Sequence, residues 1–173
     1  MNIFATDPCP RLSALALDDL RANKMVVETA QLMCTAIALS GGTTPYRPTH
    51  ANHPCAVWAR ASLSNYMWLA RHLRALLDMR PVDRPQHATD AAMSAPSGVQ
   101  RPEAFLPDIG PTPFVNCAAR SDLGIDFRHV ADVHEAYRLY LDRRWMVAKR
   151  PPRWTGRMPP PWSSFTSAHG PVK

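Results

Sequence analysis

Hydrophobic residues recur with helical spacing in three stretches of the chain, and proline-rich stretches separate them. Residues 17–39 contain no Pro or Gly, so we expect a long helix that begins near Ser13 and ends before the Gly-Gly pair at 41–42. A second long helix is expected at residues 55–79, where the pattern continues until Pro81 ends it. Because a short loop joins the two, the pattern predicts an antiparallel helical hairpin.

A third helix is predicted at residues 130–148, on an apolar stripe that comprises Val133, Ala136, Tyr137, Tyr140, Leu141 and Trp145. The connection before it, residues 81–113, contains seven prolines, which predicts a long irregular loop. After Arg150, two proline runs end regular structure. The expected fold is mainly α: one compact helical domain at residues 1–149, built on the helix pair, followed by a Pro/Trp-rich tail at residues 150–173.

Charge is distributed unevenly along the chain, with a change after Asp142. Up to Asp142 the chain has 13 basic and 14 acidic side chains, whereas the last 31 residues carry seven basic side chains and no carboxylate. Unopposed cations interleaved with tryptophans are typical of a segment that contacts a polyanion, and DNA is the expected partner. The alternative is a solvated, partly disordered tail. The predicted DNA contacts are Arg143, Arg144, Lys149, Arg150, Arg153, Trp154 and Arg157.

The apolar runs, the N-terminus and the cysteine spacing indicate where the protein is located and whether it has disulfides or a zinc ribbon. No apolar run approaches the about 20 residues that a membrane-spanning helix needs, and the N-terminus lacks the basic-then-apolar order of a signal peptide. Cys9, Cys34, Cys55 and Cys117 are scattered without a C-x-x-C pair, which indicates neither a disulfide framework nor a zinc ribbon. We therefore expect a soluble, cytoplasmic protein with reduced cysteines, no cofactor and no membrane partner.

A polar stripe follows the first long helix between apolar flanks. Arg21, Lys24, Glu28, Gln31 and Thr35 fall within roughly 80° of arc. One interpretation is a solvent-exposed face with a Lys24–Glu28 pair at (i, i+4) spacing. The other is a cleft in which a carboxylate and an amine tune each other's pKa. In that cleft Glu28 and Lys24 are catalytic, and Arg21 and Gln31 contact the substrate.

The second long helix carries a comparable stripe of Trp58, Asn65, Trp68 and His72. If the hairpin packs the two stripes toward each other, they form a substrate pocket for a planar base, because indoles stack on its face and amides bind its edge. Tryptophans at helical spacing are, however, more often part of an ordinary core than a stacking surface.

The loop between the two helices is the densest cluster of polar groups, and it contains His50, His53 and Cys55. These residues could ligate zinc, but no further Cys or His completes a recognisable spacing. Phosphate contact by His50 and His53, or local hydrogen bonding, is therefore favoured, and no metal site is expected.

Four segments of the chain resemble small phage and bacterial proteins labelled pyrimidine-dimer DNA glycosylase of the endonuclease V type. They are MNIF at residues 1–4, KMVVETAQL at 24–32, YRPTHANHPCAVWAR at 46–60 and NYMWL at 65–69. The resemblance implies a compact helical protein in which an N-terminal α-amine forms a Schiff base with the sugar and a glutamate of an early helix assists. It also implies that arginines and a tryptophan-bearing C-terminal segment hold the DNA.

By position, Glu28 resembles that glutamate, Arg21 and Lys24 resemble the basic residues beside it, and Trp154 resembles the aromatic residue of the tail. In the family the amine follows removal of the initiator methionine. Residue 2 here is Asn, whose side chain is normally too large to permit that removal. Either the amine of Met1 or that of Lys24 is therefore expected to form the imine.

Three functions fit these features. The first is a DNA glycosylase/AP lyase that extrudes a modified or damaged pyrimidine into the helical cleft, where an amine attacks the sugar C1′ and Glu28 handles the proton. The second is a transferase that modifies a nucleotide or a DNA base. The third is a non-catalytic phage protein that binds DNA or modulates the host. We expect the first, a DNA repair type of enzyme in a phage or bacterial setting.

Overall fold

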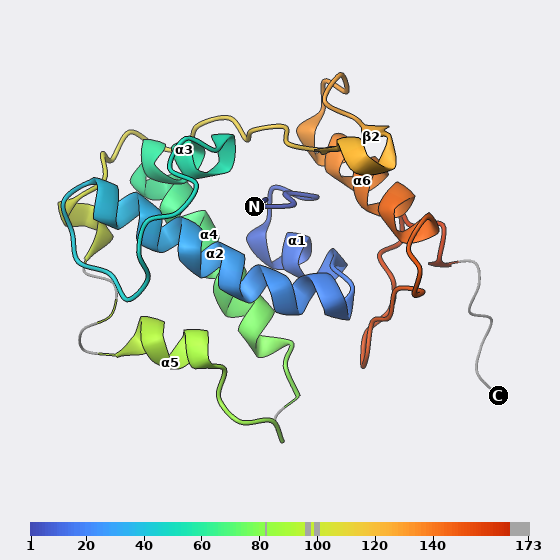
Figure 1. The fold of residues 1–173 in the computed structure, drawn as a ribbon, viewed down its shortest axis with the longest axis horizontal. Coiled ribbons are helices and arrows are strands. Elements are labelled where there is room, and N and C mark those ends of the chain that lie inside the picture. Colours follow the sequence, from blue (N-terminus) through green and yellow to red (C-terminus); the bar gives the residue numbers. More distant parts are fainter. Residues whose placement is uncertain (82, 96–97, 99–100, 167–173) are drawn as a thin grey trace.

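The computed structural model describes residues 1–81, 83–95, 98 and 101–166, and within them the protein is mainly α (Figure 1). Six α-helices lie in this described part: α1 (Pro10–Ala16), α2 (Asp19–Leu39), α3 (Pro54–Ala61), α4 (Leu63–Asp78), α5 (Ala88–Ser94) and α6 (Val133–Met146). Two short strands, β1 (Ala119–Arg120) and β2 (Ile125–Asp126), pair antiparallel ahead of α6. None of the described helices combines the length and the apolarity that a membrane crossing requires.

Helix α4 passes behind α2, and both α1 and α2 pack on it (Figure 1). The start of α2 lies beside the end of α4, where the Arg80 guanidinium donates a hydrogen bond to the Asn23 side chain. Helix α2 ends at Leu39 as predicted, because Gly41 adopts a positive φ of 94° that stops the helix.

The predicted second long helix is wrong in one respect, because it is broken into α3 and α4 at Ser62. The backbone of Ser62 is extended there, and its hydroxyl accepts a hydrogen bond from the Asn65 N–H that caps the new helix. The first predicted helix is also divided: Leu17 is extended, so the short α1 precedes α2. Helix α3 begins at Pro54, which suits the first helical position.

The N-terminal segment is buried between the α1–α4 group and α6. The Phe4 ring stacks on Tyr140, and the Arg138 guanidinium donates a hydrogen bond to the carbonyl of Thr6. Figure 1 shows the N-terminus between α2 and α6. The chain start is therefore held by packing on both sides.

The C-terminal segment also packs on the helical body, which corrects the picture of a solvated tail for residues 151–166. The Trp154 side chain is 9% exposed and donates its indole N–H to the carbonyl of Ala16. Trp162 stacks on Trp145 of α6 at a ring distance of 5.6 Å. Residues 167–173, the end of the predicted tail, lie outside the described residues.

Part of the proline-rich connection is ordered, although it was expected to be irregular throughout. It contains α5 and a single 3₁₀ turn at Pro102–Ala104. The His87 ring caps α5 by accepting a hydrogen bond from the Thr89 N–H, and the Thr89 hydroxyl bonds with that of Tyr46. The connection therefore packs against the loop that follows α2.

Candidate functional site

The chain start is folded back so that its amine points at helix α2. The Asn2 carboxamide oxygen accepts hydrogen bonds from the N–H groups of Ile3 and Phe4, which closes a tight turn. Phe4 takes a φ of 42°, an unfavourable conformation that surrounding contacts have to enforce. The other end of the Asn2 carboxamide donates to the carbonyl of Cys117. These contacts fix the direction in which Met1 leaves the turn.

The amine of Met1, Lys24 and Glu28 converge at this point, and we call these three groups the amine site. One carboxylate oxygen of Glu28 lies 4.0 Å from the Met1 nitrogen and accepts a hydrogen bond from the Asn2 N–H at 3.2 Å. The other oxygen lies 3.1 Å from the Lys24 ammonium. The predicted pairing of Lys24 with Glu28 is present, and the chain terminus joins it.

The three groups of the amine site differ in how far they are exposed to solvent. The Lys24 side chain is 71% exposed, whereas that of Glu28 is only 15% exposed. The Met1 side chain is 2% exposed although the residue as a whole is half-buried, so its accessible surface belongs to the main chain that carries the amine. A substrate can therefore approach the amine while the carboxylate stays largely shielded.

This arrangement can activate an amine as a nucleophile. A protonated amine has no lone pair to attack with, so it must first give its proton to a base. Glu28 is positioned to accept that proton or to return one to a leaving group, directly or through one water molecule. The exposed ammonium of Lys24 balances the charge of the carboxylate between these steps.

Arg21 and Gln31 extend the α2 stripe but do not join the amine site. The Arg21 guanidinium is 2.8 Å from the Asp18 carboxylate and lies over the Trp145 ring, two helical turns before Glu28. Gln31 is half-buried one turn beyond Glu28. Arg21 is therefore not in direct contact with the glutamate, and its role as a substrate contact stays a prediction.

The second stripe is part of the core, so the predicted pocket between the two stripes is not formed by these side chains. Trp58, Asn65, Trp68 and His72 are all buried, with exposures between 0% and 8%. The rings of Trp58 and Trp68 pack edge to face, and Phe114 covers both. The predicted role of these residues in substrate binding is corrected to a role in packing.

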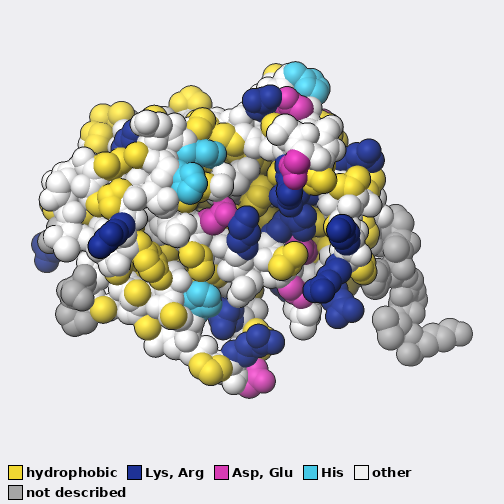
Figure 2. All heavy atoms as spheres, in the orientation of Figure 1, with side chains coloured by type: hydrophobic (Ala, Val, Ile, Leu, Met, Phe, Trp, Pro, Cys, Tyr) yellow, Lys and Arg dark blue, Asp and Glu magenta, His cyan; other side chains and the backbone are white. Residues whose placement is uncertain are grey.

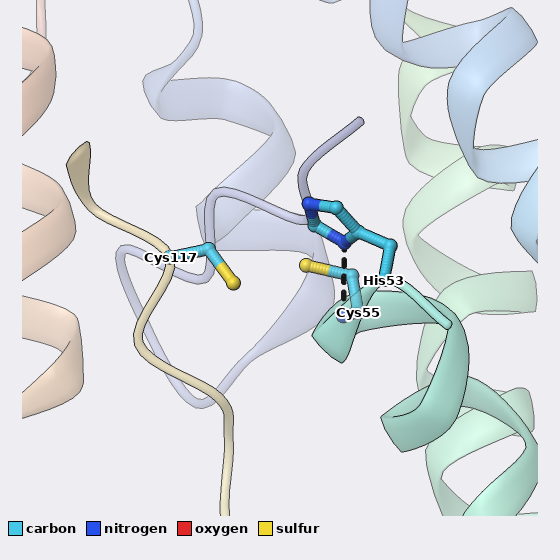
Figure 3. A group of neighbouring side chains, drawn as sticks. All are labelled: His53, Cys55 and Cys117. Carbon is cyan, nitrogen blue, oxygen red and sulfur yellow. Dashed lines mark hydrogen bonds between the residues drawn. The ribbon is translucent and has the colours of Figure 1, made fainter. Parts of the chain in front are cut away.

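A cluster of His53, Cys55 and Cys117 lies close to the amine site, and we call it the Cys/His cluster (Figure 3). Burial lowers the pKa of His53, and the positive charges of the Met1 amine and His50 lower it further. The hydrogen bond with Cys55 lowers the pKa of the Cys117 thiol to about 7 against the effect of burial, with further help from Tyr137 and the amine. The same hydrogen bond and burial raise the pKa of the Cys55 thiol.

Sequence reasoning missed the involvement of Cys117 and Tyr137 in this cluster. The Tyr137 hydroxyl accepts a hydrogen bond from the Cys117 N–H and donates one to the carbonyl of Val115, which holds the segment before β1 in place. No local spacing relates Cys117 to Cys55, because only the tertiary fold brings the two together. His50 is exposed and bonds through its Nδ1 to the Thr49 hydroxyl.

A cationic groove of about 840 Å³ lies beside the start of α2, between it and the chain that leaves α6. Its acidic members are Asp18 and Asp19, and Leu20, Leu123 and Val147 provide apolar surface. Figure 2 shows Lys and Arg side chains gathered over the start of α2 and over α6. The basic residues of the groove are Arg21, Arg120, Arg144, Lys149, Arg150 and Arg153.

The groove contains four of the predicted DNA contacts, and the remaining three lie elsewhere. Arg143 is exposed but does not line the groove. The Arg157 guanidinium donates to the carbonyls of Leu15 and Leu17 and pairs with Asp19 at 2.8 Å, and Trp154 is buried. Arg157 and Trp154 therefore fasten the C-terminal segment to the body, which corrects their assignment as DNA contacts.

The amine site and the cationic groove share one face of α2. Arg21 lines the groove and Glu28 belongs to the amine site, and seven residues separate them, which corresponds to about 10 Å along a helix. Lys24 lies between the two. A ligand in the groove can therefore reach the amine without leaving this face.

Comparison with known proteins adds nothing to this geometry. No protein-family model, curated protein or solved structure matches the chain at a significant level. Any function therefore has to be inferred from the site itself.

Proposed function

We propose that the protein is a base-excision enzyme of the DNA glycosylase/AP lyase type, acting on a modified or damaged pyrimidine with the Met1 amine as its nucleophile. The observation that carries this proposal is the accessible terminal amine 4.0 Å from the shielded carboxylate of Glu28. Imine formation at a sugar carbon requires an amine as nucleophile and a general acid/base beside it, and an amine next to a carboxylate supplies both. The resemblance of the first 80 residues to glycosylases of the endonuclease V type agrees with it.

In the proposed reaction Glu28 accepts a proton from the Met1 ammonium, and the freed lone pair attacks C1′ of the extruded nucleotide. The bond between C1′ and the base breaks, and the base leaves with the proton that Glu28 had accepted. The sugar ring then opens, its oxygen takes a proton from the attached amine, and an imine forms between Met1 and C1′. Glu28, again a carboxylate, accepts a C2′ proton, and this elimination expels the 3′ phosphate and nicks the strand. Water finally hydrolyses the imine and frees the amine.

Met1 is favoured over Lys24 as the nucleophile on geometric grounds. The Lys24 ammonium lies 3.1 Å from the Glu28 carboxylate and would have to leave this direct ion pair to attack a sugar, whereas the Met1 nitrogen lies 4.0 Å from the carboxylate. The resemblance also implies an N-terminal amine as the nucleophile. Lys24 then serves to hold the Glu28 carboxylate in position.

The cationic groove is the proposed binding surface for the DNA backbone. Arg144, Lys149, Arg150 and Arg153 supply charges that neutralise phosphates and release condensed counterions. Because the groove and the amine site lie on one face of α2, a bound strand brings a nucleotide within reach of Met1. A DNA substrate and the four free cysteines also support a cytoplasmic location.

Borohydride trapping on duplexes with abasic, pyrimidine-dimer or hypermodified sites tests the proposal. We expect a covalent adduct whose proteolytic mapping by mass spectrometry places the sugar on the N-terminal peptide. Lys24→Arg keeps the charge beside Glu28 but cannot form an imine at neutral pH, so trapping should persist in it. An adduct on Lys24 would exclude Met1 as the nucleophile. DNA binding without any adduct would favour the non-catalytic alternative.

A further inference from the structure

The Cys/His cluster combines three side chains from two distant parts of the chain. His53 and Cys55 flank the first residue of α3, while Cys117 lies on the irregular segment before β1. One ligand atom of each lies within 4.8 Å of the other two. Figure 3 shows the two thiols directed toward each other with the His53 ring beside them. Cys55 is fully buried, and the other two are half-buried.

We propose that His53, Cys55 and Cys117 bind a zinc ion. Two sulfur ligands and one imidazole nitrogen form a donor set that suits zinc, which takes Cys and His at about 2.3 and 2.0 Å. Those bond lengths place the tetrahedral ligand atoms roughly 3.5–3.8 Å apart, about 1 Å closer than the upper limit of 4.8 Å in the cluster. Cys117 lies outside any helix or strand, so a small shift of its side chain closes the difference.

Zinc binding has two identifiable costs. The thiols of Cys55 and Cys117 give up the hydrogen bond that they share and release their protons, and helix α3 loses its cap. The Nδ1 atom of His53 accepts a hydrogen bond from the Cys55 N–H at 3.2 Å. That nitrogen has a single lone pair, so ligation through Nδ1 replaces the bond, and ligation through Nε2 places the ring proton on Nδ1 and also breaks it. The bond is long for this type, and two zinc–thiolate bonds outweigh it.

The zinc would hold the amine site in shape. The carbonyl of Cys117 accepts the hydrogen bond from the Asn2 carboxamide that orients the turn before Met1. Joining Cys117 to α3 through a metal therefore fixes the direction of the amine. Two thiolates cancel the charge of Zn²⁺, so the ion does not repel the neighbouring ammonium. Three protein ligands leave a fourth position open, as in catalytic zinc sites.

Metal titration of the reduced full-length chain tests this site without any use of DNA, so its result is independent of the proposed enzymatic function. Co²⁺ is the first probe, because thiolate ligation gives a sulfur-to-cobalt charge-transfer absorption that Zn²⁺ should abolish on displacement. We expect one equivalent of Co²⁺ with this absorption, and a rise in melting temperature when Zn²⁺ is added.

Cys117→Ser is the test variant and Cys9→Ser the matched control, since Cys9 is an exposed thiol outside the cluster. Zinc affinity should fall at least about 10²-fold in Cys117→Ser and stay unchanged in Cys9→Ser. Absence of the charge-transfer absorption in the wild-type chain would overturn the proposal, even if the variant fails to fold. Equal zinc affinity in a folded Cys117→Ser chain, or a Cys55–Cys117 disulfide whose reduced form binds no Co²⁺, would overturn it as well.

Discussion

The polar stripe of α2 and the stripe of Trp58, Asn65, Trp68 and His72 resemble each other in sequence but differ in the folded protein. Lys24 of the first stripe is 71% exposed and Glu28 beside it meets the chain terminus. The second stripe is closed to solvent. A segment distant in sequence causes the difference: Thr112 bonds to Asn65, and Phe114 stacks on Trp58.

The comparison shows how the partners of a polar side chain indicate its role. Both hydrogen-bonding ends of the Asn65 carboxamide are used within the protein, since its NH₂ group donates to Trp58 and Thr112 and its oxygen accepts from the Thr112 N–H. The Glu28 carboxylate instead holds two amines, one of them highly exposed. Groups satisfied by buried neutral partners stabilise a fold, whereas charged groups gathered at a surface can exchange partners with a substrate.

The largest expected effect belongs to Asn65→Ala, which should destabilise the fold rather than alter substrate affinity. The carboxamide bonds the Trp58 carbonyl where α3 ends and no intrahelical partner is available. Its loss leaves several buried groups unpaired, at a cost of about 3 kcal/mol or more in the free energy of unfolding. Urea denaturation measures this, with exposed Asn52→Ala as the control. Unchanged stability with weakened DNA binding would return Asn65 to the substrate site.

Glu28→Gln should instead lower the reaction rate and leave the stability of the fold nearly unchanged. The change preserves shape and removes the base, so strand nicking or base release should fall at least about 10²-fold, which equals about 2.7 kcal/mol in the activation free energy. DNA affinity and melting temperature should change little, because the carboxylate is one member of a surface-connected charge group. Single-turnover nicking assays measure the rate. Wild-type turnover in Glu28→Gln would eliminate the mechanism proposed here.

Local signals in the sequence were sufficient for some features of the fold and not for others. Helix α2 and its end at Gly41 follow from periodicity and a glycine stop, and the Lys24–Glu28 pair follows from (i, i+4) spacing. The break at Ser62 was missed because a lone serine inside a helical pattern is compatible with either outcome. The burial of Trp154 and the approach of Cys117 to Cys55 depend on tertiary contacts that no local pattern encodes.

His72 should make the stability of the fold depend on pH, because it is fully buried and stacks on Trp68. Burial lowers the pKa of His72 from 6.5 to about 3, so the folded chain keeps this ring neutral where the unfolded chain protonates it. Its contribution to stability is therefore complete above pH 6.5 and is lost as the pH falls toward 3, by about 1.4 kcal/mol per pH unit.

His72→Phe keeps an aromatic ring on Trp68 and removes the titration. The difference in unfolding free energy between wild type and variant should therefore shift in favour of the variant between pH 6.5 and 5.5. His129→Gln, a change at an exposed ring, serves as the control. Parallel pH profiles for wild type and His72→Phe would mean that the ring is accessible to protons, as a member of a substrate pocket would be.

The smallest expected effect is that of one groove cation. Lys149→Ala should weaken binding to duplex DNA a few-fold for every sequence and reduce the slope of log affinity against log salt by about 1, because a single phosphate contact is lost. Arg101→Ala removes an exposed cation that does not line the groove, so it should leave the slope unchanged. Fluorescence anisotropy across a salt series measures both. Equal slopes for wild type and Lys149→Ala would show that phosphates do not occupy this end of the groove, and the path of the strand toward Met1 would have to begin at Arg21 and Arg120 instead.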